Sequence, residues 1–363
     1  MLQRGFPLFR VLGIPLYLDF SFLLILPLLA FLISSNLPVY LELFGLPQDP
    51  SLLQGTLPFL LGLSAALGLF TSVLLHELGH ALVARRFGIA TKRITLWLLG
   101  GVAQMERIPR EPKKELWIAL AGPGVSFALA LFFGLAREES GALGFLTHYL
   151  ALVNLMLGLF NLLPALPLDG GRVYRAVLAM RKSYVQATRQ ALALSQAVAW
   201  ALGLFGFVVF NPFLVLIAFF VYMASRAEGE AALLAQALSG LKVKNLMTLN
   251  PLVIPPSLSV QEVLELALAH KVSGFPVVEE GRVLGVVGLE GLEGANPLAP
   301  VGHYLKEPLV LAPEEDALTA LERMAERGYV RALVMEGDQL LGILSKTDLL
   351  RAFQIRVLGH PSP

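Results

Sequence analysis

The chain has 363 residues, of which 56% are hydrophobic and 15% are charged, whereas soluble domains carry roughly 25% charged residues, so we expect an integral membrane protein with a soluble part. The formal net charge of +1 gives no basic excess that would indicate a nucleic acid partner. Because cysteine is absent, disulfides and thiolate ligands are excluded, and any metal ion must be bound by histidine and carboxylate side chains.

Six apolar segments are close to the length of about 20 residues that a membrane-spanning helix needs. They cover residues 17–35, 57–84, 115–135, 146–165, 191–209 and 211–226. The N-terminus superficially resembles a signal peptide, but no small-residue cleavage site follows it, so we expect an uncleaved first span. The loops after the second and fourth segments are rich in Lys and Arg. This bias predicts that these loops, both termini and the soluble part are cytoplasmic.

The second apolar segment contains the sequence His76-Glu77-Leu78-Gly79-His80. Residues four apart lie on one face of a helix, so His76 and His80 can offer two imidazoles to one zinc ion, with Glu77 beside it to move a proton. These three side chains are the only ionisable ones between residues 57 and 83, where a charge near the bilayer centre costs roughly 2.5–3.5 kcal/mol. We therefore interpret them as functional, and not as a chance match in a helix.

Residues 96–105 are apolar but too short to span a membrane, and the pair Gly100-Gly101 interrupts a helix. The segment is consistent with a hairpin that dips into the membrane from the cytoplasmic side, where protein or a water-filled cavity must cover its backbone. An ordinary interfacial loop is the alternative.

The fourth apolar segment leads into the proline-containing run of residues 161–172, in which Asp169 lies between Leu168 and Gly170. Catalytic zinc usually takes three protein ligands. Asp169 is our candidate for the third, because it is expected at the same end of the span bundle as the two histidines. It could also cap the helix that begins at Gly170, and the two roles are compatible. Asn161 and Asn154 are amides in an apolar helix, for which an interhelical hydrogen bond is the simplest role.

The chain changes character near Glu228, after which the long apolar runs end and an internal repeat begins. Pro251-Leu252-Val253 recurs as Pro308-Leu309-Val310, and Leu284-Gly285-Val286-Val287 recurs as Leu341-Gly342-Ile343-Leu344. Both matches have an offset of 57 residues, which indicates a duplicated unit.

The repeat divides the soluble part into two copies with the same predicted elements. We expect domains at residues 1–227 and 228–363, the second containing copies at about 243–297 and 301–358. Each copy should have one helix, at 259–271 and at 315–328. Each helix should be followed by two strands, at 275–279 with 283–288 and at 331–335 with 340–344, joined through Gly281 and Gly337.

Three motifs together resemble the site-2 protease family of intramembrane zinc metalloproteases, over residues 1 to about 226. They are His76 to His80, Gly122-Pro123 in the third apolar segment, and the run from Asn161 to Arg172. The resemblance implies a multispanning helical membrane protein with one zinc ion per chain. It assigns the zinc ligands to His76, His80 and Asp169, the general base and acid to Glu77, and a polar group near the scissile carbonyl to Asn161.

The same resemblance implies that residues Gly100 to Met105 form an edge strand on which an unwound transmembrane substrate pairs. Many members of the family have Asn after the Ala-Gly-Pro of the third span, where this chain has Ser126. The role of that position is therefore left open.

The duplicated unit resembles a tandem pair of cystathionine-beta-synthase-type (CBS) domains, an α/β module that in many proteins binds adenosine-containing nucleotides. In the second copy, Ser345 and Asp348 stand where the family contacts phosphate and ribose of ATP, ADP or AMP. The first copy has Gly288 and Gly291 at these places, so at most one nucleotide site is expected. A pair that only forms a homodimer or packs against the membrane domain is the alternative.

We therefore expect an intramembrane zinc endopeptidase in the lipid bilayer of a prokaryotic cell membrane, which hydrolyses peptide bonds in or near transmembrane segments of other proteins. A membrane transporter or channel regulated by CBS domains is the alternative, although it has no need for the zinc motif. The connection between the halves, from Arg226 to Val243, is short and partly helical. We expect it to hold the tail against the cytoplasmic face, where nucleotide binding could regulate cleavage.

Overall fold

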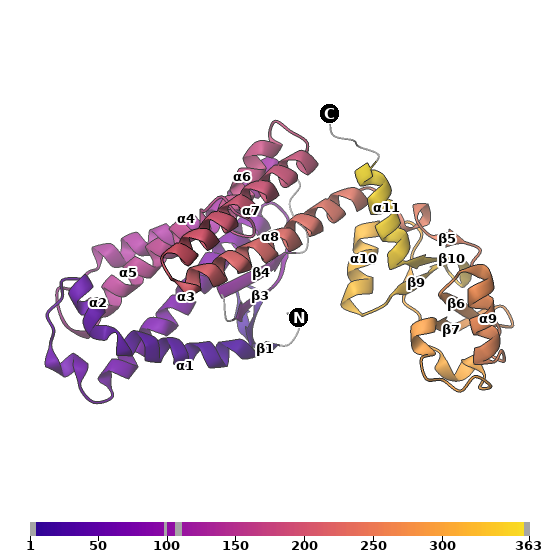
Figure 1. The fold of residues 1–363 in the computed structure, drawn as a ribbon, viewed down its shortest axis with the longest axis horizontal. Helices are drawn as coiled ribbons and strands as arrows, with labels where there is room; N and C mark the ends of the chain where they lie inside the picture. Colours follow the sequence, from indigo (N-terminus) through magenta and orange to yellow (C-terminus); the bar gives the residue numbers. More distant parts are fainter. Residues whose placement is uncertain (1–4, 98–99, 106–110, 359–363) are drawn as a thin grey trace. The chain divides into compact units, whose positions relative to one another are not determined.

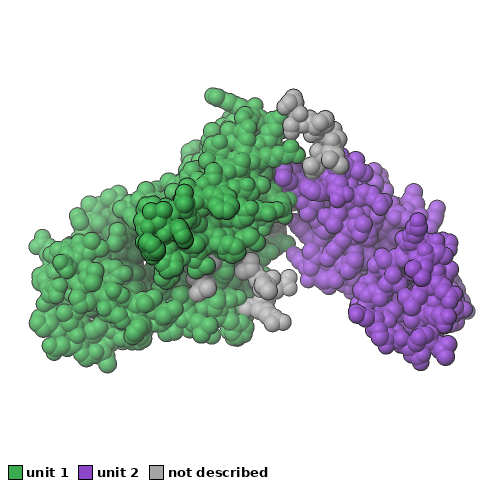
Figure 2. All heavy atoms as spheres, viewed as in Figure 1, with its two compact units in different colours: residues 1–232 green, residues 233–363 purple. Residues whose placement is uncertain are grey.

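The computed structural model describes residues 5–97, 100–105 and 111–358 (Figure 1). The chain divides into two compact units, unit 1 with residues 1–232 and unit 2 with residues 233–363 (Figure 2). The boundary falls within helix α8 (Pro212–Leu238).

Unit 1 is built around helix α3 (Leu57–Arg86), a 30-residue apolar helix. At 1.5 Å per residue it is about 45 Å long, which exceeds the roughly 30 Å thickness of a bilayer core. Glycines let its neighbours approach closely: a Cβ on Gly62 would lie 2.2 Å from the carbonyl oxygen of Ala30 in α1 (Phe20–Ser35), and one on Gly79 would lie 2.9 Å from that of Ala121 in α4 (Pro112–Leu135). Small residues at such contacts are typical of helix packing in membranes.

Five helices in the described part of the chain are long and apolar enough to cross a membrane. They are α3, α4, α5 (Gly141–Asn161), α7 (Tyr184–Val208) and α8. A sixth span is obtained if α1 and α2 (Leu37–Leu43), which meet at an angle of 61°, count as one. The remaining helices of unit 1 are α6 (Asp169–Ala179) and the short η1 (Pro50–Leu53). The fold therefore agrees with the prediction of about six spans.

Several predicted span boundaries need correction. The first helix begins at Phe20 and not at residue 17, and α5 and α7 begin at Gly141 and Tyr184, ahead of the predicted residues 146 and 191. The fourth span was expected to reach residue 165, but α5 ends at Asn161, and the segment that follows, with Pro164 and Pro167, forms turns. The helix expected in the linker is confirmed, as the end of α8, which continues from Pro212 to Leu238. The turn expected between the last two spans is confirmed: the Asn211 side chain accepts hydrogen bonds from the backbone amides of Phe213 and Leu214 and so caps α8.

A four-stranded sheet in unit 1 was only partly predicted. It has the order β1 (Gly5–Val11), β2 (Ile14–Asp19), β3 (Thr91–Trp97), β4 (Gly100–Met105). The β3 and β4 strands form an antiparallel hairpin and β4 lies at the edge of the sheet, which confirms the edge strand and excludes a plain loop. Residues 5–19 were not expected to form strands, nor was β3 expected to pair in parallel with β2.

Unit 2 contains the duplicated elements that the repeat predicts. The first copy has α9 (Val260–His270), β6 (Gly274–Glu279) and β7 (Arg282–Gly288), and the second has α10 (Ala317–Glu326), β9 (Arg331–Glu336) and β10 (Gln339–Ser345). Corresponding elements begin 57 residues apart. Gly281 and Gly337 have φ values of +79° and +59°, so both hairpin turns use the left-handed region that favours glycine.

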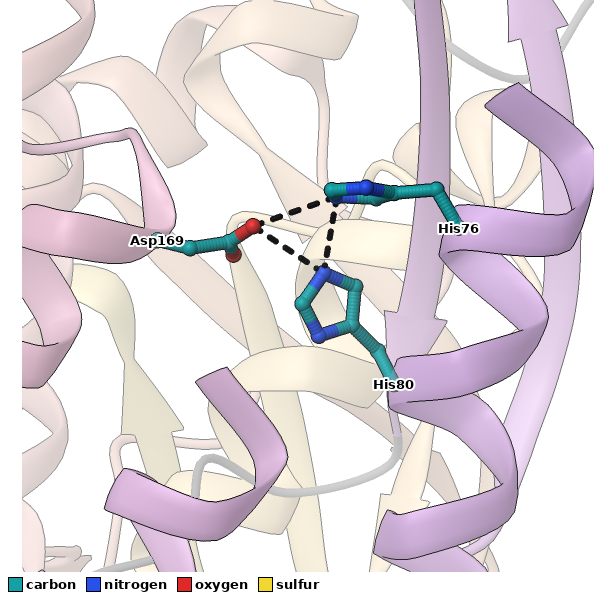
Figure 3. A group of neighbouring side chains, drawn as sticks. All are labelled: His76, His80 and Asp169. Carbon is teal, nitrogen blue, oxygen red and sulfur yellow. Dashed lines mark hydrogen bonds and ion pairs between the residues drawn. The ribbon is translucent and has the colours of Figure 1, made fainter. Parts of the chain in front are cut away.

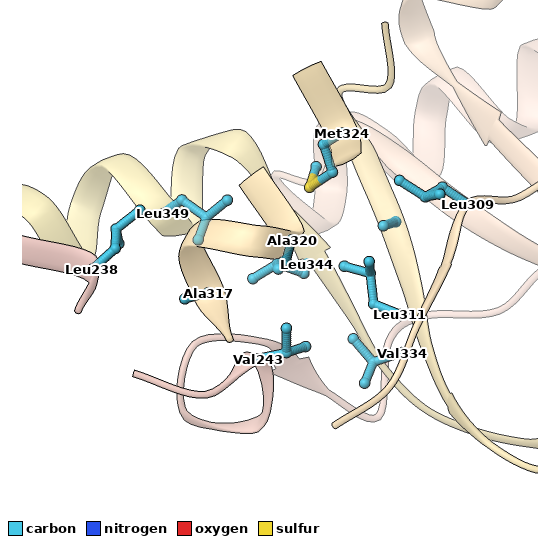
Figure 4. Close-up of a cluster of buried hydrophobic side chains, with 11 residues drawn as sticks. Leu238, Val243, Leu309, Leu311, Ala317, Ala320, Met324, Val334, Leu344 and Leu349 are labelled. Atoms are coloured by element: carbon cyan, nitrogen blue, oxygen red, sulfur yellow. The ribbon is translucent and has the colours of Figure 1, made fainter. Parts of the chain in front are cut away.

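The main strands of each copy form a sheet of their own over a core of their own, but the start of the first copy joins the sheet and the core of the second. Strands β6 and β7 pair with each other, whereas β9 and β10 belong to a sheet of order β5-β10-β9-β8, with β5 (Thr248–Leu249) and β8 (Val310–Leu311) at its edges. Helix α11 (Lys346–Leu358) and the short η2 (Val243–Asn245), η3 (Leu289–Gly291) and η4 (Val301–Tyr304) complete the unit. The second copy buries a cluster that includes Val243, Met324 and Leu344 (Figure 4).

Candidate metal centre

Helices α3 and α6 bring together the three residues that the sequence predicts as zinc ligands (Figure 3). His76 and His80 lie one turn apart on α3, and their Nε2 atoms are 3.2 Å from each other. One carboxylate oxygen of Asp169, the first residue of α6, lies 3.2 Å from the Nε2 atom of each histidine. All three side chains are buried. The sequence therefore predicted correctly that these residues converge, although Asp169 is 93 positions from His76 in the chain.

The spacing of these donors fits a tetrahedral metal. Zinc binds imidazole nitrogen and carboxylate oxygen at roughly 2.0–2.2 Å, so neighbouring ligands at the corners of a tetrahedron lie about 3.4 Å apart. The three observed separations of 3.2 Å are close to this value. Gly122 of α4 faces the same place, because a Cβ there would lie 2.2 Å from Nε2 of His80 and 2.6 Å from Nε2 of His76. The spacing of the three donor atoms, and the room that the missing side chain of Gly122 leaves beside the two Nε2 atoms, therefore suit a zinc ion.

The second ring nitrogen of each histidine is also held. Nδ1 of His80 donates to the backbone carbonyl of Ile118 at 2.6 Å, and Nδ1 of His76 lies 2.8 Å from the hydroxyl oxygen of Ser126. A carbonyl can only accept, so Nδ1 of His80 carries the proton and its Nε2 presents a lone pair to a metal. Ser126, whose role the sequence left open, is fully buried and orients His76.

Asp169 does not cap its helix. Leu168 occupies the N-cap position of α6, where no side-chain hydrogen bond is formed, and the Asp169 carboxylate contacts the two histidines instead. The alternative role as a cap is therefore wrong. The tight start of α6 depends on glycine, since a Cβ on Gly170 would lie 2.2 Å from the carbonyl oxygen of Leu162.

Glu77 lies between helix α3 and the edge strand β4. Its Oε2 atom accepts a hydrogen bond from the backbone amide of Ala103 at 3.1 Å. A Cβ on Gly101 would lie 2.7 Å from Cγ of Glu77, so the strand passes directly against this side chain. The residue predicted to carry protons is thus next to a predicted metal ligand, His76, and in contact with the strand that is predicted to bind substrate.

The two asparagines of α5 have different surroundings. Asn154 is buried and donates to the Ser72 hydroxyl of α3 at 2.9 Å, which confirms the interhelical hydrogen bond. Asn161 is half-buried at the end of α5 and donates to the carbonyl of Leu157 within the same helix at 2.9 Å. A hydrogen bond to another helix is therefore not what holds Asn161, and its predicted contact with a substrate stays a prediction.

Ser345 and Asp348 of unit 2 lie together at the start of α11. The Asp348 carboxylate accepts hydrogen bonds from the backbone amide and the hydroxyl of Ser345, at 2.9 Å and 2.6 Å, and the Ser345 hydroxyl accepts from the amide of Asp348 at 3.2 Å. This reciprocal arrangement is a capping box. The side chains of the two residues predicted to bind nucleotide are therefore in contact, and each already forms hydrogen bonds with the other residue.

At the equivalent place in the first copy, Gly288 and Gly291 leave room for other side chains. Arg331 donates to both carboxylate oxygens of Glu290, at 2.8 Å and 2.9 Å. Burial acts to raise the pKa of Glu290, but the hydrogen bonds from Arg331 bring this pKa below its ordinary value. A cavity of about 380 Å³ lies beside the pair, and its lining includes Gly288, Glu290, Lys306, Arg327, Tyr329 and Arg331.

Comparisons with known proteins identify the family of the chain. The family model described as "Peptidase family M50" matches residues 64–137 and 135–204, and the model described as "CBS domain" matches residues 243–292 and 301–355. The chain is 36% identical, over 96% of both chains, to a protein of Methanocaldococcus jannaschii named as a zinc metalloprotease. It is 34% identical to Rip3 of Mycobacterium tuberculosis, covering 100% of this chain and 96% of that one. The solved site-2 protease from Methanocaldococcus jannaschii is similar with a TM-score of 0.44 and 33% identity, over 62% of this chain and 95% of that chain.

Proposed function

Because this chain belongs to peptidase family M50 and is a zinc metalloprotease of the site-2 type, we propose that His76, His80 and Asp169 are its zinc ligands and that Glu77 is its general base and acid. The observation that carries this proposal is the triangle of 3.2 Å distances among three buried donors. A transporter or channel with a CBS tail, the alternative from the sequence, would leave this triangle without a purpose.

The residues of this chain divide the chemistry between them. When bound, a zinc ion supplies Lewis-acid activation of water and of the scissile carbonyl. Glu77 takes the proton of the attacking water and later delivers it to the leaving amine. Ser126 and the carbonyl of Ile118 keep the two histidines in the orientation that presents Nε2. Glu77 lies outside the triangle of donors, which supports a role in proton transfer.

The proposed substrate is a transmembrane segment of another membrane protein. A helix in lipid satisfies its backbone hydrogen bonds internally, so the segment must unwind before a peptide bond is exposed to attack. Strand β4 is at the edge of its sheet, and pairing with it would replace the lost hydrogen bonds. In this arrangement the backbone amide of Ala103 gives up its hydrogen bond to Glu77 and donates to the substrate instead. The side chain of Asn161 gives up its hydrogen bond to the carbonyl of Leu157 and donates to the scissile carbonyl.

The protein is an integral membrane protein, and we assign its orientation from the distribution of Lys and Arg. Residues 85–114 and 172–189, which comprise the loops after α3 and around α6 and the adjoining helix ends, carry most of the Lys and Arg in unit 1. This supports a cytoplasmic position for both segments and for both termini. For the tail we propose binding of an adenine nucleotide at Ser345 and Asp348, with regulation of cleavage as its consequence. Formation of a homodimer through the tail is the second candidate role.

Substitution of Glu77 by Gln separates proton transfer from metal binding. We expect Glu77→Gln to retain one zinc per chain while cleavage of a model transmembrane substrate falls by at least a hundredfold, in line with the loss of a general base. Zinc is measured by elemental analysis and cleavage by gel in detergent or liposomes. Glu138→Gln, a change at an exposed acid, serves as the control. Cleavage above a few percent of the wild-type rate would refute the role of Glu77.

A further inference from the structure

Two arginines and two glutamates form a charged cluster in unit 1, apart from the three proposed ligands. Arg172 of α6 forms a fork with Glu228 of α8: its Nε and Nη2 atoms lie 3.1 Å and 3.2 Å from the two carboxylate oxygens. Arg175, one turn further along α6, donates from Nε to Glu115 of α4 at 2.8 Å and reaches Glu228 at 3.5 Å. The cluster thus joins α6 to two other helices.

Burial makes the pair of Arg175 and Glu115 costly unless it has a purpose, whereas the side chain of Arg172 is 40% exposed. Arg175 is 1% exposed and Glu115 is 3% exposed. Removing two charges from water costs several times what an ordinary hydrogen bond contributes, and well-packed apolar side chains often stabilise a protein as well as a buried ion pair does. One oxygen of Glu115 and one nitrogen of Arg175 are also buried without a hydrogen-bond partner. General stability therefore explains the cluster poorly, whereas directional forks fix the position of a helix well.

The helix held by the cluster is the one that carries Asp169. Helix α6 has 11 residues, and Asp169 is its first. Arg172 lies one turn after Asp169 and Arg175 one turn after that, so both arginines are on neighbouring positions of a short rigid element. Ligand distances at a metal tolerate changes of only about 0.2 Å. A small rotation or shift of α6 would therefore move the Asp169 carboxylate away from the histidines of α3.

We propose that Arg172, Arg175, Glu115 and Glu228 are positioning residues for Asp169, and that the fork between Arg172 and Glu228 ties the metal centre to α8. Helix α8 continues beyond Glu228 across the boundary between the two units. The position of α8 thereby sets the affinity of the centre for its metal. This inference rests on the proposed metal ligands.

The test compares two neutralised glutamates on the same helix. In Glu228→Gln the fork to Arg172 is lost, and we expect the dissociation constant for zinc, measured by competition with a chelator, to rise about tenfold. This is the lower end of the roughly 10–100-fold loss found when direct partners of metal ligands are removed, because Glu228 acts through Arg172. The visible absorption bands of the cobalt-substituted protein should change because the position of Asp169 changes. Glu230→Gln removes an exposed carboxylate two residues away, whose partner is Arg226 at 3.4 Å. It should leave both measurements unchanged.

A double variant distinguishes positioning from the cost of leaving the partly exposed Arg172 without its carboxylate partner. In Arg172→Gln/Glu228→Gln neither charge of the fork remains, so the thermal midpoint should recover toward that of the wild type, while zinc affinity stays low because the fork is still absent. The proposal is overturned if zinc affinity recovers together with stability, or if folded Glu228→Gln binds zinc as the wild type does. Failure of the metal ligands themselves would instead appear as zinc binding that survives His76→Ala.

Discussion

Each histidine of the proposed metal centre forms a hydrogen bond through its Nδ1 atom, His76 with Ser126 and His80 with Ile118. Of these two partners, only Ser126 could be singled out from the sequence. Ser126 was noticed because it follows the Ala-Gly-Pro of the third span. The partner of His80 is the backbone carbonyl of Ile118, which has no side-chain signal in the sequence. The convergence of the proposed ligands was predictable because their residue types are rare in apolar segments, whereas backbone partners depend on how helices pack.

Gly122 offers a direct test of the space beside the histidines. We expect Gly122→Ala to abolish zinc binding, because the new Cβ would lie 2.2 Å from Nε2 of His80 and 2.6 Å from Nε2 of His76. Such overpacking also costs about 1–3 kcal/mol of stability. Zinc content of the purified variant is the measurement. Gly124→Ala is the matched control, since a Cβ at Gly124 would meet nothing within 4 Å. Normal zinc content in Gly122→Ala would place the metal elsewhere.

Among the elements of unit 1, the long helices followed from local sequence, whereas of the four strands only β4 was expected. Long apolar segments predicted α3, α4, α5, α7 and α8 because hydrophobic length is a local property. Strands β2 and β3 pair in parallel although Leu16 and Ile94 are far apart in sequence. A hydrophobic pattern within one segment does not indicate which distant segment it will pair with. The end of α5 was placed too late because apolar residues continue through the turns at 162–168.

The contact between β4 and Glu77 can be changed without touching a ligand. In Gly101→Ala the Cβ would lie 2.7 Å from Cγ of Glu77 and 3.1 Å from Cγ1 of Val73, so the carboxylate must move. We expect the cleavage rate to fall roughly tenfold or more, as for a misplaced general base, with zinc content unchanged. Rates on one transmembrane substrate and zinc analysis are measured together. Equal loss of zinc and of activity would show that the strand supports the ligands and not Glu77.

At the scale of the whole molecule, the chain joins a membrane-embedded protease to a duplicated soluble module. The offset of 57 residues predicted helices α9 and α10 and the strand pairs that follow them, because a repeat constrains both copies at once. Helix α11 and the short strands β5 and β8 were not among the elements expected. The function of the module was less predictable, since Ser345 and Asp348 also form the capping box of α11.

A nucleotide effect should depend on Asp348 and not on helix capping in general. We expect ATP to bind the full-length protein by calorimetry and to change its cleavage rate, and both effects should be lost in Asp348→Ala. Loss of a cap costs about 0.5–2 kcal/mol, so Glu262→Ala, which breaks the similar capping box of α9, is the control for destabilisation. A wild type that neither binds ATP nor responds to it would leave the tail as a dimerisation or packing module.

The central claim is that one carboxylate on α6 completes a metal centre with two histidines on α3. The most direct measurement is the zinc content and cleavage rate of Asp169→Ala beside the wild type. We expect one zinc per chain in the wild type, and in the variant a loss of most of the zinc together with activity, because two histidines alone lack the third protein ligand. Full zinc content and full activity in Asp169→Ala would contradict the account and require another residue as the third ligand.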